Sequence, residues 1–599
     1  MAENKVLTRA EVPEELTWNL CDLYPTDEAF LEDLAKVPEI AEKIASYKGR
    51  ISADAKTLLE YLRYGDELDL FLSKLANYAM RKADQDATNS KYQEYRGRLM
   101  MSYTAISSAF AFETPELIAM DDETFESFFK AEPDLELYRL KLTRVRREKA
   151  HILSEKEEAL MAALSPVKRS ASEIYEMFET ADVKFPPVHD ENGNEMPLTT
   201  GTFIPYLMSP DRRLRKEAFE NLYNTFTQYK NTLAACYDGE VKGRIFSAKA
   251  RNYASTLEAA LSGNEVPTSV YHNLIDAVHE NMHYMHKYIK LRKKLMGVDE
   301  LHMYDLYTSI IADADKEVSF EQAKEETVAA TAVLGEEYTA MLKEGFANRW
   351  IDVMENVGKR SGAYSAGARP HPYVLLNHKN DLDHEFTLAH EMGHALHSYL
   401  SQKNQPVCYS DYVIFVAEVA STCNEALLMQ YLLGKTEGKK ERAYLINHFL
   451  EQFRGTLYRQ TMFAEFEMLT NEMAEKGQPL TADALCELYH KLNVEYYGDG
   501  ITVDPEIDYE WERIPHFYYN FYVFQYATGF SAAIALSQRI LKEGEPAVKD
   551  YLKFLSGGCS TDPISLLKIA GVDMNSPEPV ANALKLFGEL IDEMEELLA

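Results

Sequence analysis

The sequence predicts a mostly α-helical fold with two parts and one small β element. Apolar side chains recur every three or four positions along most of the 599 residues, which is the period of an amphipathic helix. Runs of β-branched residues are few, and only two short stretches, 183–200 and 373–377, have the pattern of strands. A chain of this length can bury a large core and suggests two or more domains, or one domain elaborated by helices.

Composition and charge restrict the class of protein. With 46% hydrophobic and 27% charged residues the chain has a globular composition, and its net charge of −33 argues against nucleic acid and anionic membranes as partners. The N-terminus has no apolar signal-peptide region, and no apolar run approaches the length of a membrane span. The six cysteines are scattered without C-x-x-C spacing, so we expect reduced thiols and a cytoplasmic location.

The N-terminal third reads as successive helices, including 26–36, 39–47, 55–69, 71–83, 122–131 and 135–149. A helix at 154–164 opens with Ser154 and Glu157, which have the spacing of a capping box. The Asn192–Gly193 pair then predicts a β hairpin within 183–200. We place a domain boundary there, with a helical domain at 1–200 that ends in the hairpin and a second helical domain at 201–599.

Helices resume at 211–247, 269–296 and 319–344. A glycine-rich stretch at 360–372 interrupts them, and the short apolar run 373–377 predicts a strand just before the next helix. If that strand lies at a sheet edge, it could pair with an extended peptide backbone. The alternative is a connecting hairpin that only packs against its neighbours.

The helix that follows carries the motif H-E-x-x-H within Phe-Thr-Leu-Ala-His-Glu-Met-Gly-His-Ala-Leu-His, residues 386–397. On a helix His390 and His394 lie about 40° apart and roughly 6 Å along the axis, so both imidazoles can reach one zinc ion. Glu391 is poorly placed as a ligand but well placed to hold a water molecule on the metal. The opposite face is apolar, and Asp381 or Asp383 could cap the helix. The alternative is a pair of ordinary histidines in a core or on a surface.

A hydrolytic zinc site needs a third protein ligand. His397 lies about 10 Å along the axis from His390, too far for all three histidines to meet, so it reads as supporting or structural. Glu418 is the better candidate, because it lies in a very apolar helix where a carboxylate needs a cation. Glu425, two turns further on, could orient a ligand histidine or form an ion pair with an arginine or lysine.

Helices then cover 439–476 and 482–497, and an aromatic cluster follows within 511–529. It includes His516, Tyr519, Tyr522 and Tyr526, whose N–H and O–H groups are the kind of donors that stabilise an oxyanion. The alternative is an aromatic core without a chemical role.

Three stretches together resemble oligoendopeptidase F, of the zinc-peptidase family that also contains thimet oligopeptidase and neurolysin. They are the motif at 386–397, Phe-Val-Ala-Glu-Val-Ala-Ser-Thr at 415–422, and Ile-Pro-His-Phe-Tyr-Tyr-Asn-Phe-Tyr-Val-Phe-Gln-Tyr-Ala-Thr-Gly-Phe at 514–530. The resemblance implies a large helical metallopeptidase with two parts flanking a deep channel that admits short, unstructured peptides. It also implies Zn²⁺ held by His390, His394 and Glu418, with Glu391 as general base.

The resemblance further assigns oxyanion or substrate contacts to His516, Tyr522 and Tyr526. Related enzymes have one more tyrosine three residues later, where this chain has Gly529, so that contact is not carried over. Tyr519 matches no motif position.

We therefore expect a zinc-dependent endopeptidase that hydrolyses internal bonds of short oligopeptides through a metal-activated water. A zinc carboxypeptidase or aminopeptidase and a non-catalytic peptide-binding protein with a zinc site remain alternatives. The sequence leaves open the cleavage preference, substrate length limit, physiological substrate and oligomeric state, and whether Glu425, His397 and Tyr519 support, contact substrate or only pack.

Overall fold

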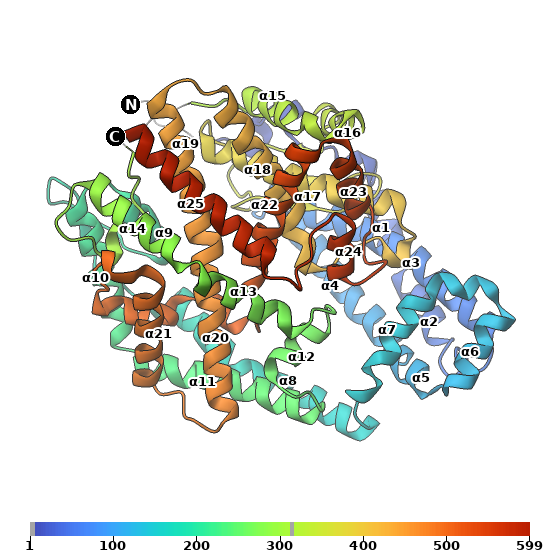
Figure 1. The fold of residues 1–599 in the computed structure, drawn as a ribbon. Coiled ribbons are helices and arrows are strands. Elements are labelled where there is room, and N and C mark those ends of the chain that lie inside the picture. Colours follow the sequence, from blue (N-terminus) through green and yellow to red (C-terminus); the bar gives the residue numbers. More distant parts are fainter. Residues whose placement is uncertain (1–5, 312–316, 599) are drawn as a thin grey trace. The chain divides into compact units, whose positions relative to one another are not determined.

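The computed structural model describes residues 6–311 and 317–598, and the fold is mostly helical, as the sequence predicts (Figure 1). The chain forms two compact units, each built from three separate segments. Unit 1 comprises Met1–Ala150, Lys316–Tyr431 and Leu536–Gly571, and unit 2 comprises His151–Asp315, Leu432–Ala535 and Val572–Ala599. The domain boundary near residue 200 stays a prediction.

Unit 1 contains the H-E-x-x-H helix, α17. Its helices are α1 (Asp27–Leu34), α2 (Val37–Ala45), α3 (Ala55–Gln85), α4 (Ser90–Phe110), α5 (Glu113–Ala119), α6 (Asp122–Ala131), α7 (Arg139–Arg147), α15 (Phe320–Thr331), α16 (Glu336–Ala347), α17 (Leu382–Asn404), α23 (Glu545–Leu555) and α24 (Pro563–Ile569). Helix α18 (Ala417–Lys435) begins here, and the division between the units falls within it. Phe30, Leu75 and Leu99 are fully buried in the core of the N-terminal helices, which also includes Leu375.

Unit 1 also contains a three-stranded sheet in the order β3 (Ile351–Asp352), β5 (Tyr373–Leu375), β4 (Tyr364–Ala366). Strand β5 pairs in parallel with β3 and in antiparallel with β4. The predicted strand is thus present but central, since both its edges are already paired. The edge strands are β3 and β4, and β4 packs against α17. A buried ion pair between Lys359 Nζ and Asp352 Oδ1 at 2.7 Å anchors β3.

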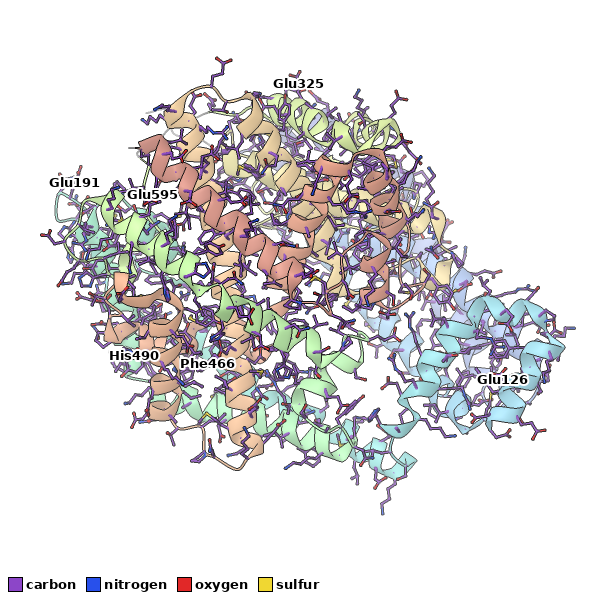
Figure 2. All side chains as sticks on the ribbon, in the orientation of Figure 1. Glu126, Glu191, Glu325, Phe466, His490 and Glu595 are labelled. Carbon is purple, nitrogen blue, oxygen red and sulfur yellow. The ribbon has the colours of Figure 1, made fainter. Side chains whose placement is uncertain are left out.

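Unit 2 is built from longer helices and one hairpin. Its elements are α8 (Glu155–Met177), β1 (Val188–His189), β2 (Glu195–Met196), α9 (Thr200–Met208), α10 (Arg212–Thr227), α11 (Lys230–Ala250), α12 (Thr256–Ser262), α13 (Thr268–Glu280), α14 (Met282–Met296), α19 (Lys439–Gln452), α20 (Arg459–Glu475), α21 (Ala482–Tyr497), most of α22 (Phe524–Glu543), and α25 (Glu578–Leu598). Figure 2 shows the side chains on this ribbon, among them Phe466 of α20, which is fully buried.

Several local predictions are confirmed. Strands β1 and β2 form the predicted antiparallel hairpin, with Val188 opposite Met196. The Ser154 side chain and Glu157 form the predicted capping box at the start of α8. None of the described helices combines the length and apolar composition that a membrane span requires.

Several helix boundaries were predicted wrongly. The helices expected at 55–69 and 71–83 are one continuous helix, α3, and those expected at 269–296 and 319–344 are each divided, between α13 and α14 and between α15 and α16. Helix α8 runs through Pro166, because this proline lies on an exposed part of the helix where the freed carbonyl can bond to water. The single helix predicted at 211–247 is broken between Thr227 and Lys230, where Phe226 is fully buried against the rings of Phe178 and Phe185. No glycine or proline marks this break in the sequence.

Candidate metal centre

Helix α17 places two histidines opposite an apolar stripe. His390 and His394 are half-buried, whereas the apolar side chains on the other side are almost completely buried: Leu388, Met392, Leu396 and Leu400. Of the two predicted caps, Asp381 is the one used, and its carboxylate accepts a hydrogen bond from the His384 N–H at 2.9 Å.

Helices α17 and α18 meet backbone to backbone at Gly393. A Cβ atom at this position would lie 2.6 Å from Ser421 Cα and 2.8 Å from the Ala420 carbonyl oxygen. The contact is supported by Asn424, whose side-chain amide donates to the Ala389 carbonyl at 3.1 Å. The close approach brings Glu418, in the first turn of α18, beside the two histidines.

Three donor atoms converge between these helices. His390 Nε2 and His394 Nε2 are 3.1 Å apart, and Glu418 Oε2 lies 3.4 Å from the first and 3.5 Å from the second. Zinc–ligand distances of about 2.0–2.2 Å at tetrahedral angles place neighbouring ligand atoms roughly 3.3 Å apart. The triangle therefore has the size of a tetrahedral zinc shell. Within the described parts of the chain, it is the one group of three such side chains whose geometry could hold a metal ion.

Glu425 lies on the far side of His390. Its Oε1 accepts a hydrogen bond from His390 Nδ1 at 2.5 Å, so the other ring nitrogen faces His394 and Glu418. Burial alone would lower the pKa of His390, but hydrogen bonds to Glu418 and Glu425 raise it well above its usual value. Despite burial, hydrogen bonds to His390 and His394 hold the pKa of Glu418 well below its usual range. The group therefore favours positive charge at its centre, which a divalent metal would supply.

Glu391 is a buried carboxylate with an unused oxygen. It is 6% exposed, and its Oε2 has no hydrogen-bond partner among the described residues. Burial raises the pKa of this carboxyl group, while the charges of His390 and His394 act in the opposite direction. A carboxylate with a raised pKa beside a metal-binding group is suited to accept and return a proton.

His397 does not belong to the group of three donors. It is fully buried and stacked on the Tyr412 ring, with centroids 3.7 Å apart. Burial lowers the pKa of His397 to about 3, so the ring is neutral. Burial raises the pKa of Tyr412 to about 12, with smaller contributions from Glu418 and Glu391. Sequence reasoning did not single out Tyr412, because nothing in its spacing links it to the motif.

The aromatic cluster predicted from the sequence forms in unit 2. The His516 ring centroid lies 5.4 Å from that of Tyr519, 6.1 Å from Tyr526 and 6.3 Å from Tyr522. His516, Tyr522 and Tyr526 are half-buried, whereas Tyr519 is 56% exposed. Gly529 lies inside α22 one turn beyond Tyr526.

Glu467 and Arg244, which the sequence did not single out, hold the loop that carries this cluster. Asn520 and Phe521 both have left-handed backbone conformations, with φ of 52° and 58°. The Phe521 N–H donates to Glu467 Oε1 at 2.8 Å. Arg244 pairs with the same oxygen at 2.8 Å and donates to the Phe517 carbonyl at 2.6 Å. Left-handed backbone at residues other than glycine costs about 1–2 kcal/mol each, so these contacts are needed to hold the loop.

Two imidazoles and a carboxylate from adjacent helices, with a further buried carboxylate next to them in sequence, form the donor set of a metallopeptidase. The comparisons agree with this class. Residues 206–586 match peptidase family M3, and residues 116–185 match a second family described as Oligopeptidase F. The chain belongs to peptidase family M3.

Relatives over the full length support the assignment. Oligopeptidase PepF of Bacillus subtilis is 48% identical over 99% of this chain and 89% of its own length. Group B oligopeptidase PepB of Streptococcus agalactiae is 40% identical over 99% of this chain and 98% of its own length. The crystal structure of oligoendopeptidase-F from Enterococcus faecium aligns with a TM-score of 0.75 at 37% identity, covering 96% of this chain and 99% of that one. The resemblance predicted from the sequence motifs is confirmed.

Replacing Gly393 by alanine should separate α17 from α18 and weaken metal binding. The added methyl group would meet backbone atoms, which cannot move aside as a flexible side chain can. We expect Gly393→Ala to lower the melting temperature and to reduce zinc affinity in equilibrium dialysis.

Gly65→Ala is the matched control, because Gly65 lies within α3 and nothing lies within 4 Å of its added Cβ. That variant should be as stable as the parent or more stable. Unchanged zinc affinity in Gly393→Ala would contradict the role given to the helix contact.

Proposed function

We propose that the protein is a zinc-dependent endopeptidase that hydrolyses internal bonds of short oligopeptides. The observation that carries the proposal is the triangle of His390 Nε2, His394 Nε2 and Glu418 Oε2, with edges of 3.1–3.5 Å. Support for oligopeptides as substrates comes from the relatives, which are named oligopeptidases or oligoendopeptidases.

The donor set fits zinc better than magnesium or calcium. Two imidazole nitrogens and one carboxylate oxygen are typical zinc ligands, whereas magnesium and calcium prefer oxygen ligands throughout. When bound, zinc supplies two effects: it lowers the pKa of a water molecule towards about 7, and it polarises the peptide carbonyl. The Glu425 contact to His390 Nδ1 orients this imidazole and raises its basicity as a ligand.

Glu391 is the proposed general base. Its unpartnered Oε2 takes a proton from the attacking water and later returns it to the amine of the leaving peptide. The pKa of this carboxyl group is raised above that of an exposed glutamate and so lies nearer to pH 7, which favours both proton transfers.

His516, Tyr522 and Tyr526 are the proposed donors to the oxyanion or to the substrate backbone. Burial and the nearby charge of Arg459 lower the pKa of His516, so its ring is neutral at pH 7 and keeps one N–H to donate. The Glu467 and Arg244 contacts fix the loop that carries the cluster, which agrees with the need for preorganised donors. Gly529 leaves this chain without a donor at the position of the further tyrosine in related enzymes.

The remaining expectations stay predictions. They are the division into domains at 1–200 and 201–599, the channel between the two parts, the cytoplasmic location, and the lack of nucleic-acid or membrane partners. Free thiols at all six cysteines are in keeping with a reducing compartment. The free edge of β4 beside α17 takes the place of 373–377 as the candidate for pairing with substrate backbone.

Substitution of Glu391 should lower kcat without changing zinc content, whereas substitution of Glu425 should lower zinc affinity. Glu391→Gln removes the base but no proposed ligand, so we expect unchanged zinc content and a drop in kcat of about 10²–10⁴-fold. Glu425→Gln keeps an acceptor oxygen for His390 Nδ1 but removes its negative charge, so zinc affinity should fall about 10–100-fold and activity should recover in excess zinc. Metal analysis and steady-state kinetics measure both.

Asp383→Asn is the control. Asp383 lies in the exposed first turn of the same helix, and its substitution removes one negative charge, as Glu391→Gln does. Substantial turnover by Glu391→Gln would rule out the general-base assignment.

Removing a hydroxyl from the aromatic cluster should lower kcat more than it changes KM. If Tyr522 or Tyr526 donates to the oxyanion, we expect its substitution by phenylalanine to lower kcat roughly 10²–10³-fold. Tyr519→Phe is the matched control within the same group of rings, and its activity should stay near the parent value. Full kcat in both Tyr522→Phe and Tyr526→Phe would refute the role.

Peptides blocked at both ends separate the endopeptidase from its alternatives. An acetylated and amidated peptide should be cut at an internal bond, and a chelator should abolish the cutting until zinc is added back. Mass spectrometry identifies the products. Cutting of unblocked peptides only would favour a carboxypeptidase or aminopeptidase, and binding without products would favour a non-catalytic protein.

A further inference from the structure

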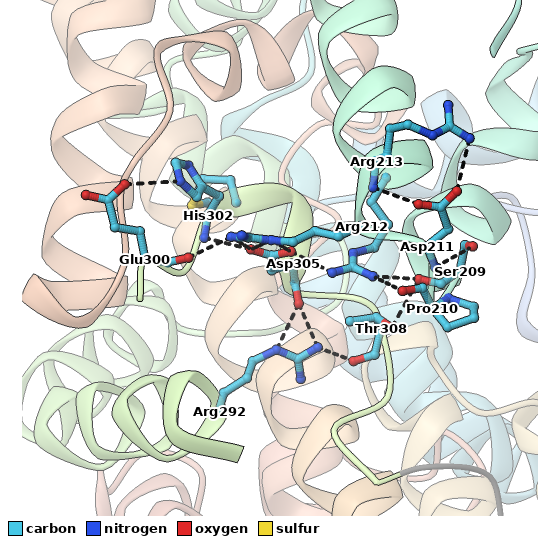
Figure 3. A network of polar contacts seen from close by, with 12 residues as sticks. Ser209, Pro210, Asp211, Arg212, Arg213, Arg292, Glu300, His302, Asp305 and Thr308 are labelled. Carbon is cyan, nitrogen blue, oxygen red and sulfur yellow. Dashed lines mark hydrogen bonds and ion pairs between the residues drawn. The ribbon is translucent and has the colours of Figure 1, made fainter. Parts of the chain in front are cut away.

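Unit 2 contains a group of six arginines that pair, two by two, with three buried or half-buried carboxylates. The first carboxylate is Asp305, which is fully buried and accepts hydrogen bonds from Arg212 Nη2 and Arg215 Nη2, each at 2.8 Å. Figure 3 shows Arg212 and Asp305, with Arg292 donating to the main chain at Asp305 and Thr308. Two guanidinium groups therefore share one carboxylate.

The second carboxylate, Glu451, continues the group. Arg292 Nη1 donates to Glu451 Oε1 at 3.0 Å, and Arg454 Nε and Nη2 donate to Oε2 at 3.0 and 2.7 Å. Arg454 is 3% exposed, lies 4.9 Å from the centroid of the Tyr307 ring, and follows the start of a π-helical segment (Phe453–Tyr458). Its Nη1 is buried and has no hydrogen-bond acceptor among the described residues.

The third carboxylate is Glu510. Its Oε1 accepts hydrogen bonds from Arg459 Nη2 and Arg513 Nη2, each at 2.6 Å, and its Oε2 accepts from the Tyr489 hydroxyl at 2.6 Å. Arg459 has no other ion-pair partner among the described residues, and its side chain is 13% exposed. It therefore has donors left over and some access to solvent.

The charges of the group do not balance. Six arginines, namely Arg212, Arg215, Arg292, Arg454, Arg459 and Arg513, pair with three carboxylates, Asp305, Glu451 and Glu510. Among these nine side chains positive charges exceed negative ones by six minus three, or three, and the charge of Asp504 also acts on Arg212. Arg212 is 40% exposed, whereas the side chains of the other five arginines are 0–15% exposed. Buried positive charge in excess of its counterions is costly, so the group suits an anion that arrives from outside.

Arg459 connects this group to the aromatic cluster. Its guanidinium lies 4.2 Å from the centroid of the Phe463 ring. The Phe463 and Phe517 ring centroids are 5.5 Å apart, and Phe517 directly follows His516 in the sequence. The charge of Arg459 also contributes, after burial, to the lowered pKa of His516. An anion at Arg459 would therefore be held near the residues proposed to contact the reacting peptide.

We propose that Arg459, with Arg454 and Arg513 supplying further positive charge, binds a carboxylate of the peptide substrate. The inference rests on the proposed function and adds a determinant of substrate choice to it. A guanidinium matches a carboxylate with two parallel hydrogen bonds, and such charge-assisted bonds are stronger than neutral ones. The carboxylate belongs either to the C-terminus of the peptide or to an aspartate or glutamate side chain.

The test compares peptides that differ only in one carboxylate. Internally quenched peptides of one sequence are made with a C-terminal carboxylate or amide, and a second pair, amidated in both members, carries glutamate or glutamine. The wild-type protein should prefer the carboxylate member of one pair by about 10- to 100-fold in kcat/KM. A preference within the first pair identifies the C-terminal carboxylate as the ligand, and a preference within the second pair identifies the acidic side chain. In Arg459→Met this ratio should fall to about 1, and in Arg459→Lys it should be intermediate, because lysine keeps the charge but not the fork.

Arg442→Met is the matched control. Arg442 lies in the same unit and pairs with Glu593, and its substitution removes one positive charge, as Arg459→Met does. Its carboxylate preference should stay at the wild-type value. Equal loss in Arg442→Met and Arg459→Met would mean a long-range field and would overturn the subsite. Wild-type protein that treats both members of both pairs alike would overturn it as well.

Binding to the Glu391→Gln variant separates this inference from the proposed catalysis. Fluorescence anisotropy gives the dissociation constants of the same peptides without turnover, and their ratio should again depend on Arg459. A binding preference without cleavage by the wild-type protein would sink the proposed function and keep the subsite. Should Arg459→Met fail to fold, as judged by circular dichroism, Arg459→Lys and Arg513→Met carry the comparison.

Discussion

The packing of α17 against α18 at Gly393 is the constraint on which the metal centre depends. Helices normally keep their axes about 8–10 Å apart because side chains lie between them. Here the missing Cβ lets the α18 backbone at Ala420 and Ser421 approach α17 directly. Glu418 lies one turn before Ser421 and is brought within 3.4 Å of His390 Nε2 by this approach. A larger residue at Gly393 would move the third donor out of reach while leaving H-E-x-x-H intact.

Given that contact, the environment assigns different tasks to three carboxylates of the same residue type. Glu418 faces two imidazoles, which hold its pKa low, so it remains an anion. Glu425 is occupied by His390 Nδ1 and acts through that ring. Glu391 is the most buried of the three, and its raised pKa together with its unpartnered oxygen suits proton transfer. The differences arise from partners and burial rather than from chemistry intrinsic to glutamate.

The predictable part of the site is the part encoded at short range. The spacing of His390 and His394 fixes their common face on any helix, and an apolar helix around Glu418 already implies a partner for its charge. The fold class followed from the same helical periodicity. What the sequence could not indicate are contacts between distant positions: Glu467 pairs with Arg244, 223 residues away, and receives the N–H of Phe521. Neither residue has a local pattern that distinguishes it from an ordinary charged residue on a helix.

The same limit explains why the arginine group emerges only in three dimensions. Arg292 and Glu451 are separated by 159 residues and Arg459 and Glu510 by 51, so neither pair falls within the few turns over which a helical pattern can be recognised. On the sequence each arginine counts towards a strongly acidic average, and that average conceals a local excess of positive charge. Buried guanidinium groups that outnumber their carboxylates are expensive to keep, and a ligand that supplies negative charge would offset part of that cost. Peptides with a free C-terminus or an acidic side chain carry a carboxylate, which is the anion that we propose for this group.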